Sequence, residues 1–197
     1  TLSLHDALPI SLRWFLVTGS TPGQDIRFSY KKMDASWNFI NKIWNASRYV
    51  IMNLGDMPAP QLPDQSKWDL ADRWILSRLN TTVKDVTAKF EKFEFGEAGR
   101  DLYNFIWNDF CDWYIEMTKE KLTNGTDEEK DATKNILGYV LDQTLKLIHP
   151  IMPFVTEKLW QAMPHDGQSI MVADYPVEHA ELANQKAEGE MEDLIEL

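Results

Sequence analysis

The chain has 197 residues, of which 44% are hydrophobic and 26% are charged, and this suits one globular domain with an apolar core. The mean hydropathy of −0.39 and the lack of an apolar run of about 18 residues argue against a membrane-spanning protein. A single cysteine, Cys111, excludes an intrachain disulfide framework and a multi-cysteine metal site. We therefore expect a reducing, cytoplasmic compartment, no membrane partner and no bound metal.

The formal net charge is −11, which for the chain as a whole argues against DNA and other nucleic acids, because Lys and Arg supply most non-specific affinity for phosphate. The charge is unevenly distributed, however. Residues 12–55 contain six basic and two acidic side chains, so a basic N-terminal quarter precedes an acidic remainder.

Residues 1–11 complete no periodic pattern and lack the basic start of a signal peptide. We predict that they are a non-native leader and contribute little to stability. Residues 12–17 form an apolar run that we interpret as the end of a helix. Glycine and proline residues within 19–23 then break this helix and predict an irregular loop.

The first long helix is predicted over residues 31–54, where apolar side chains recur at spacings of three and four. Gly55 and a proline-rich linker end it. The positions expected to face the core are Met33, Trp37, Ile40, Trp44, Ser47, Ile51 and Leu54.

Three further amphipathic patterns predict long helices. The second helix begins at the N-cap Asp69 and ends near Gly96, and the third covers about 97–122, with an apolar arc wide enough for a central helix. The fourth begins with a capping box, Thr126 and Glu129, and ends before His149 and Pro150. The expected core positions are Ile75, Leu79, Val83, Val86, Phe90 and Phe93 in the second helix, and Thr133, Ile136, Val140, Thr144 and Leu147 in the fourth.

Beyond Pro150 we predict a short helix from Pro153 to Met163 and an extended piece over 169–175. An amphipathic helix is predicted to begin at Ala180 and to be truncated where the sequence stops. Four long helices joined by short loops, with no alternating strand and helix pattern, predict an all-α, up-and-down helical bundle.

No catalytic or metal-binding motif stands out. The four histidines lack a ligand partner at helical spacing. Asp109, Asp112 and Glu116 share a face of the third predicted helix, a pattern more typical of a solvated surface than of a metal site. A glycine-rich phosphate loop, a nucleophile elbow and a His-Ile-Gly-His signature are all absent from the sequence. We expect this chain to contain no catalytic, cofactor-binding or metal-binding residue.

The first predicted helix carries a second, polar face. Asn38, Asn41, Asn45 and Arg48 fall within roughly 80° of one another around the helix, with Lys42 at the edge. Asparagine is a poor helix former, so three on one side require a reason. Amides hydrogen-bond the edges of unpaired bases, and Arg stacks on bases or holds phosphate. This face therefore predicts recognition of single-stranded RNA, against the alternative of an ordinary polar surface.

An aromatic residue in the third predicted helix is a further candidate. Trp113 has the chemistry of a platform on which a base stacks. The competing interpretation is that an aromatic on an apolar helical arc belongs to the core.

Several runs of the sequence resemble the region of valyl-tRNA synthetases that follows the catalytic domain. Asn-Lys-x-Trp-Asn and His-Pro-x-Met-Pro are shared with sibling class I synthetases, whereas Gly-Gln-Asp-x-Arg is the more valyl-like run. The resemblance covers nearly all of 12–197. The matching runs, in chain order, are 12–16 (Leu-Arg-Trp-Phe-Leu), 23–28 (Gly-Gln-Asp-Ile-Arg-Phe), 38–48, which begins Asn-Phe-Ile-Asn-Lys-Ile-Trp-Asn, 70–79, 110–114 (Phe-Cys-Asp-Trp-Tyr) and 149–154 (His-Pro-Ile-Met-Pro-Phe).

This resemblance implies the anticodon-binding domain of a class I aminoacyl-tRNA synthetase. Residues 12–30 would end the junction with the catalytic domain, 31–165 would form the bundle, and 166–197 would hold an extended segment and the start of a further helix. The implied partners are a valine-type tRNA and the missing catalytic domain in cis, which would use ATP, so this fragment alone is expected to be inactive. The tRNA-contacting candidates are Asn38, Asn41, Lys42, Asn45, Arg48 and Trp113.

Two alternatives remain open at this point. The first is the corresponding domain of an isoleucyl, leucyl or methionyl enzyme, which would differ in the anticodon it reads. The second is a helical protein-interaction module whose asparagine stripe contacts a protein. Binding of RNA should weaken steeply with salt, whereas an apolar protein interface should not.

Overall fold

The computed structural model describes residues 4–19, 25 and 27–195, with side-chain environments in the first helix given from Pro9 onward. These residues fold entirely into helices, turns and loops, without a strand, which confirms the predicted all-α class. Most of the predicted loop at 19–23 and part of the Gly-Gln-Asp-x-Arg run lie outside the described residues. The helices are α1 (Leu4–Thr18), α2 (Tyr30–Leu54), α3 (Leu70–Glu91), α4 (Phe95–Asn104), a π-helical segment (Phe105–Tyr114), α5 (Ile115–Asn124), α6 (Asp127–Ile148), α7 (Pro153–Trp160) and α8 (Gln185–Ile195).

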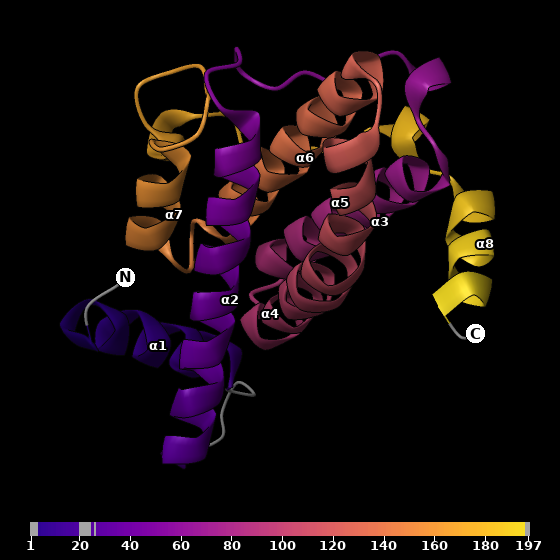
Figure 1. The fold of residues 1–197 in the computed structure, drawn as a ribbon. Helices are drawn as coiled ribbons and strands as arrows, with labels where there is room; N and C mark the ends of the chain where they lie inside the picture. The colour runs from indigo at the N-terminus through magenta and orange to yellow at the C-terminus, as the bar shows by residue number, and fades with distance from the viewer. Residues whose placement is uncertain (1–3, 20–24, 26, 196–197) are drawn as a thin grey trace.

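The long helices pack side by side around one apolar core (Figure 1). α3 contacts α4, the π-helical segment, α6 and α8, and α2 contacts α1, α6 and the π-helical segment. Figure 1 shows α8 beside α3, at the edge of the bundle away from α1 and α2. The π-helical segment is therefore held between α2 and α3, and this arrangement brings it opposite the polar face of α2.

Helix α1 runs across residue 11 rather than beginning after it. Ile10 and Ser11 are buried, and Arg13 Nη2 donates to the carbonyl oxygen of Pro150 at 3.1 Å. The end of the 1–11 segment is thus part of a packed helix, and the expectation that residues 1–11 contribute little to stability stays a prediction that deletion tests.

The buried face of α2 is wider than the predicted stripe. Phe39, Ile43 and Val50, which lie outside that stripe, are buried, whereas Trp37 and Trp44 are only partly buried. The reason is tertiary: α1, α6 and the π-helical segment cover α2 from several sides. Periodicity located the helix correctly, but its neighbours set which residues are enclosed.

Helix α3 ends at Glu91, five residues before the predicted boundary at Gly96. Phe93 lies beyond the helix with a φ of 61°, a left-handed conformation that bulky residues rarely adopt. Its side chain is 72% exposed and packs edge-on against Phe95. The prediction that Phe93 belongs to the core is therefore wrong, while Ile75, Leu79, Val83 and Val86 are buried as predicted.

The third predicted helix is continuous but not uniform, because hydrogen bonding changes to the wider π pattern over Phe105–Tyr114. This change rotates side chains away from the positions that a uniform α-helix would assign them. Asp109 faces α3, where Arg78 Nε donates to it at 2.9 Å, whereas Asp112 pairs with Lys42 on α2. The two carboxylates thus do not share a face as predicted.

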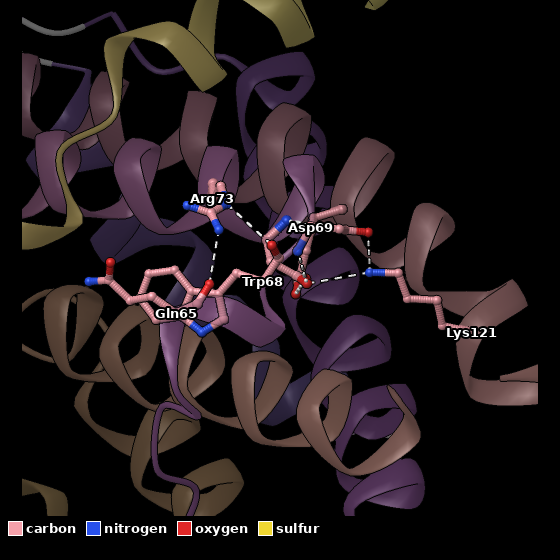
Figure 2. Close-up of polar contacts among 7 residues, drawn as sticks. Gln65, Trp68, Asp69, Arg73 and Lys121 are labelled. Carbon is pink, nitrogen blue, oxygen red and sulfur yellow. Dashed lines mark hydrogen bonds and ion pairs between the residues drawn. The ribbon is translucent and has the colours of Figure 1, made fainter. Parts of the chain in front are cut away.

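At the start of α3, polar contacts join this helix to the preceding linker and to α5 (Figure 2). Asp69 and Asp72 form a reciprocal capping box, which confirms the predicted N-cap, and Lys121 on α5 pairs with both carboxylates. Arg73 donates to the carbonyl oxygens of Trp68 at 3.2 Å and Gln65 at 2.9 Å, which fastens the linker to α3. These contacts hold α5 in place, and α5 supplies part of the groove described below.

The C-terminal part confirms some predictions and corrects others. Thr126 and Glu129 form the predicted capping box of α6, whose five predicted core positions are all buried, and Pro153 begins α7. The piece predicted to be extended over 169–175 contains a 3₁₀ turn at Ile170–Val172 instead. The last helix begins at Gln185 rather than Ala180, after a separate 3₁₀ turn.

Candidate nucleic-acid interface

A groove of about 510 Å³ runs between α2 and the facing helix made of the π-helical segment and α5. One wall is the polar face of α2, and the other combines polar and apolar side chains from the facing helix. The α2 wall consists of Asn38, Asn41, Lys42, Asn45, Ala46 and Tyr49, and the facing wall of Cys111, Asp112, Ile115, Glu116 and Lys119.

Four of the six predicted site residues lie together in this groove, namely Asn38, Asn41, Lys42 and Asn45. Arg48 is exposed but does not line the groove. Trp113 is 37% exposed, so it is not a fully buried core residue, and it also lies outside the groove lining. The structure therefore brings the three asparagines and Lys42 together and leaves Arg48 and Trp113 apart from them.

The lysines of the groove are paired with carboxylates. Lys42 pairs with Asp112 across the groove, and Lys119 pairs with Glu116 at 2.6 Å along one helix. The two lysines and two carboxylates of the lining cancel in formal charge. The groove thus presents three neutral amides and two ion pairs, and its lining has no net formal charge.

Two further side chains shape the walls. Burial raises the pKa of Tyr49, an effect that nearby Lys119 partly offsets, and the ammonium of Lys119 lies 5.8 Å from the centre of that ring. Burial also raises the pKa of Cys111 to about 12. Both groups are therefore neutral near pH 7, and Cys111 acts as apolar surface rather than as a thiolate.

The facing wall was only partly anticipated. Trp113 was the one residue of the facing helix predicted to contact tRNA. Its neighbour Asp112 lines the groove instead, together with Glu116 and Lys119, and these three residues were not predicted as site residues. Glu116 lies four residues after Asp112, and Lys119 lies three residues after Glu116. This spacing is the available signal, because residues three or four apart share one face of a helix. What the sequence lacks is any indication of which helix lies opposite α2.

Other kinds of site were also sought in the described part of the chain. No helix there is both long enough and apolar enough to cross a bilayer. The same residues contain no group of three or more His, Cys, Asp or Glu side chains placed to hold a metal ion.

The all-α bundle with a polar interhelical groove agrees with the comparisons to known proteins. Residues 72–197 match the family described as the anticodon-binding domain of tRNA ligase. The chain belongs to this family. A structure of the agnB2 LeuRS from Agrobacterium radiobacter K84, solved as a ternary complex with tRNA and LeuAMS, shares the fold with a TM-score of 0.69 at 17% identity, over 89% of this chain and 20% of that one.

Similar curated sequences narrow the resemblance further. The valine–tRNA ligase of Lactiplantibacillus plantarum is 69% identical over 187 residues, which make up 95% of this chain and 21% of that ligase. The valine–tRNA ligases of Enterococcus faecalis and Bacillus cereus are 61% and 54% identical over the same shares. The chain therefore spans about a fifth of the length of these relatives.

Proposed function

We propose that this chain is the anticodon-binding part of a valine–tRNA ligase and that the groove beside α2 contacts unpaired anticodon bases. The observation that carries the proposal is the row of three asparagine amides along a groove without net charge. Each amide both donates and accepts hydrogen bonds, as the edges of unpaired bases require. The identities of 54–69% to valine–tRNA ligases support the choice of valine.

Within such an enzyme this chain would grip tRNA while another part performs the chemistry. The relatives' name implies joining valine to tRNA, and by family resemblance ATP drives that reaction. Neither the sequence motifs nor the groove fits ATP, because a glycine-rich loop to hold the phosphates is missing from the sequence. We therefore place ATP and the catalytic residues in a catalytic domain that is joined to this chain in cis, and the whole enzyme in the cytoplasm.

The central test compares a valine tRNA with the same transcript carrying a different anticodon. Changing Asn45→Ala should weaken binding of the valine tRNA by about 1–3 kcal/mol and narrow its advantage over the altered tRNA, since a base contact is lost. Asn53→Ala is the matched control, because Asn53 lies on the same helix but outside the groove. Filter binding at fixed salt measures both quantities. Unchanged affinity and discrimination for Asn45→Ala would contradict the anticodon assignment.

Variants of residues outside the groove distinguish contacts with phosphate from contacts with bases. Lys31 and Lys32 are exposed at the start of α2, so Lys31→Ala and Lys32→Ala should weaken all tRNAs about equally if they touch phosphate alone. Trp113→Ala distinguishes the two interpretations of that residue. A stacking platform loses tRNA affinity with the fold intact, whereas a packing role lowers the free energy of unfolding.

The alternatives give different results in the same assay. An isoleucyl, leucyl or methionyl domain would prefer its own tRNA over the valine tRNA. A protein-interaction module would bind no tRNA with anticodon preference, and its protein partner would dissociate little with added salt.

A further inference from the structure

We propose that Asp112 is a positioning residue that sets the specificity of the groove by restraining the ammonium of Lys42. This inference rests on the proposed function of the groove. In this arrangement Lys42 offers a directed donor to a neutral base edge, and Asp112 keeps phosphate from occupying the same place.

The contacts around Lys42 restrain the position of its ammonium. Its Nζ lies 3.9 Å from the centre of the Trp107 ring and pairs with the Asp112 carboxylate. The Lys42 side chain is 23% exposed, whereas that of Asp112 is 48% exposed. A lysine on α2 is thus held by two residues of the facing π-helical segment, although lysine ordinarily has a flexible and strongly hydrated ammonium.

The aromatic surface beneath the ammonium is itself fixed. The Trp107 ring stacks on Tyr103 at 5.4 Å with an interplanar angle of 13°, and Tyr103 packs against the fully buried Phe39 of α2 at 4.9 Å. The ring cannot follow a moving lysine without disturbing this stack. Ring and carboxylate together therefore determine where the ammonium lies.

The negative charge of Asp112 makes the place beside Lys42 less favourable for a phosphate than for a neutral base. An ammonium has three N–H donors, and a carboxylate partner leaves donors for a further acceptor. A neutral carbonyl oxygen or ring nitrogen of a base meets no charge repulsion from Asp112, whereas a phosphate does. Removing the carboxylate charge would free Lys42 to bind phosphate in any tRNA, which adds affinity without sequence information.

The test is a double-mutant cycle in the 197-residue chain, measured as affinity against salt for the valine tRNA and for the anticodon-altered transcript. Asp112→Asn should strengthen binding of the altered tRNA several-fold, lower the discrimination ratio, and steepen the log–log salt slope by about 0.7–0.9, the value of one phosphate contact. Lys42→Met keeps the aliphatic stem and removes the charge. In that background, Asp112→Asn should change neither the ratio nor the slope.

The controls separate positioning from charge and folding. Glu120→Gln makes the same charge change at an exposed position of α5 outside the groove and should leave discrimination intact. Thermal unfolding establishes that each variant is folded, and Asp112→Ser replaces Asp112→Asn if the latter is not. A purely structural role would shift the melting temperature without altering the salt slope.

Two results would overturn the inference while the proposed function survives. One is a wild-type chain that discriminates between the tRNAs and an Asp112→Asn variant that discriminates equally well. The other is an effect of Asp112→Asn that persists in the Lys42→Met background, since Asp112 would then act on RNA without Lys42. A wild-type chain that shows no anticodon preference would instead overturn the proposed function, and this inference with it.

Discussion

Changing Tyr114→Phe removes a single hydroxyl from the place where the π-helical segment meets α3. Tyr114 is fully buried, and its Oη donates to Asp72 Oδ1 at 2.7 Å. A hydrogen bond to a charged group contributes about 1.5–3 kcal/mol, and its loss leaves a buried carboxylate oxygen without that donor. We expect the free energy of unfolding to fall by about 2 kcal/mol and the melting temperature by about 4–8 °C for a chain of this size.

The loss should depend on pH in a defined direction. Burial and then the charge of Asp69 raise the folded-state pKa of Asp72, while Lys121 and the Tyr114 hydroxyl lower it, so Tyr114→Phe raises that pKa further. When a carboxyl has a higher pKa in the folded state than in the unfolded state, the free energy of unfolding falls as the pH rises from the unfolded pKa to the folded pKa. The stability gap between wild type and Tyr114→Phe should therefore widen as the pH rises from about 4 toward neutrality.

At alkaline pH the gap should narrow again. Burial and the neighbouring Asp72 raise the pKa of Tyr114 well above its ordinary value, so above about pH 10, where the unfolded tyrosine ionises, wild type loses a contribution to stability that the variant never had. Urea unfolding across this range measures the gap, with the partly buried Tyr103→Phe as control. A gap below about 0.5 kcal/mol, or one independent of pH, would refute the reasoning.

Three further changes test other parts of the structure. Gly138→Ala should destabilise the fold by about 1–3 kcal/mol despite better helix propensity, because its Cβ would lie 2.4 Å from Pro60 Cγ and 2.8 Å from Pro60 Cβ; urea unfolding checks this, and Pro60→Gly, which removes both of these atoms, should make the Gly138→Ala change less costly. Cys111, with a pKa of about 12, should react with a thiol reagent at pH 8 far more slowly in the folded chain than in urea. Deleting 1–11 should lower the free energy of unfolding by about 2 kcal/mol through the loss of buried Ile10, and an unchanged melting temperature would show that this helix end is dispensable.

Local patterns in the sequence determined much of this fold. Capping residues such as Asp69 and Thr126 marked the starts of α3 and α6, because a cap satisfies backbone donors within a few residues of itself. The asparagine face of α2 was predictable for the same reason, since angular position on one regular helix depends on spacing alone. These features need no information about distant parts of the chain.

Tertiary structure decided which residues meet across helices. The π pattern over Phe105–Tyr114 turned Asp109 toward α3 and Asp112 toward α2, a rotation that apolar spacing does not reveal. The same packing exposed Phe93 and left Trp113 outside the groove. The sequence by itself therefore determined the helices and one wall of the site, because those depend on short-range geometry. The opposite wall, and the pairing of Lys42 with Asp112, depend on how two helices some 70 residues apart in sequence pack against each other, and only the folded chain sets that.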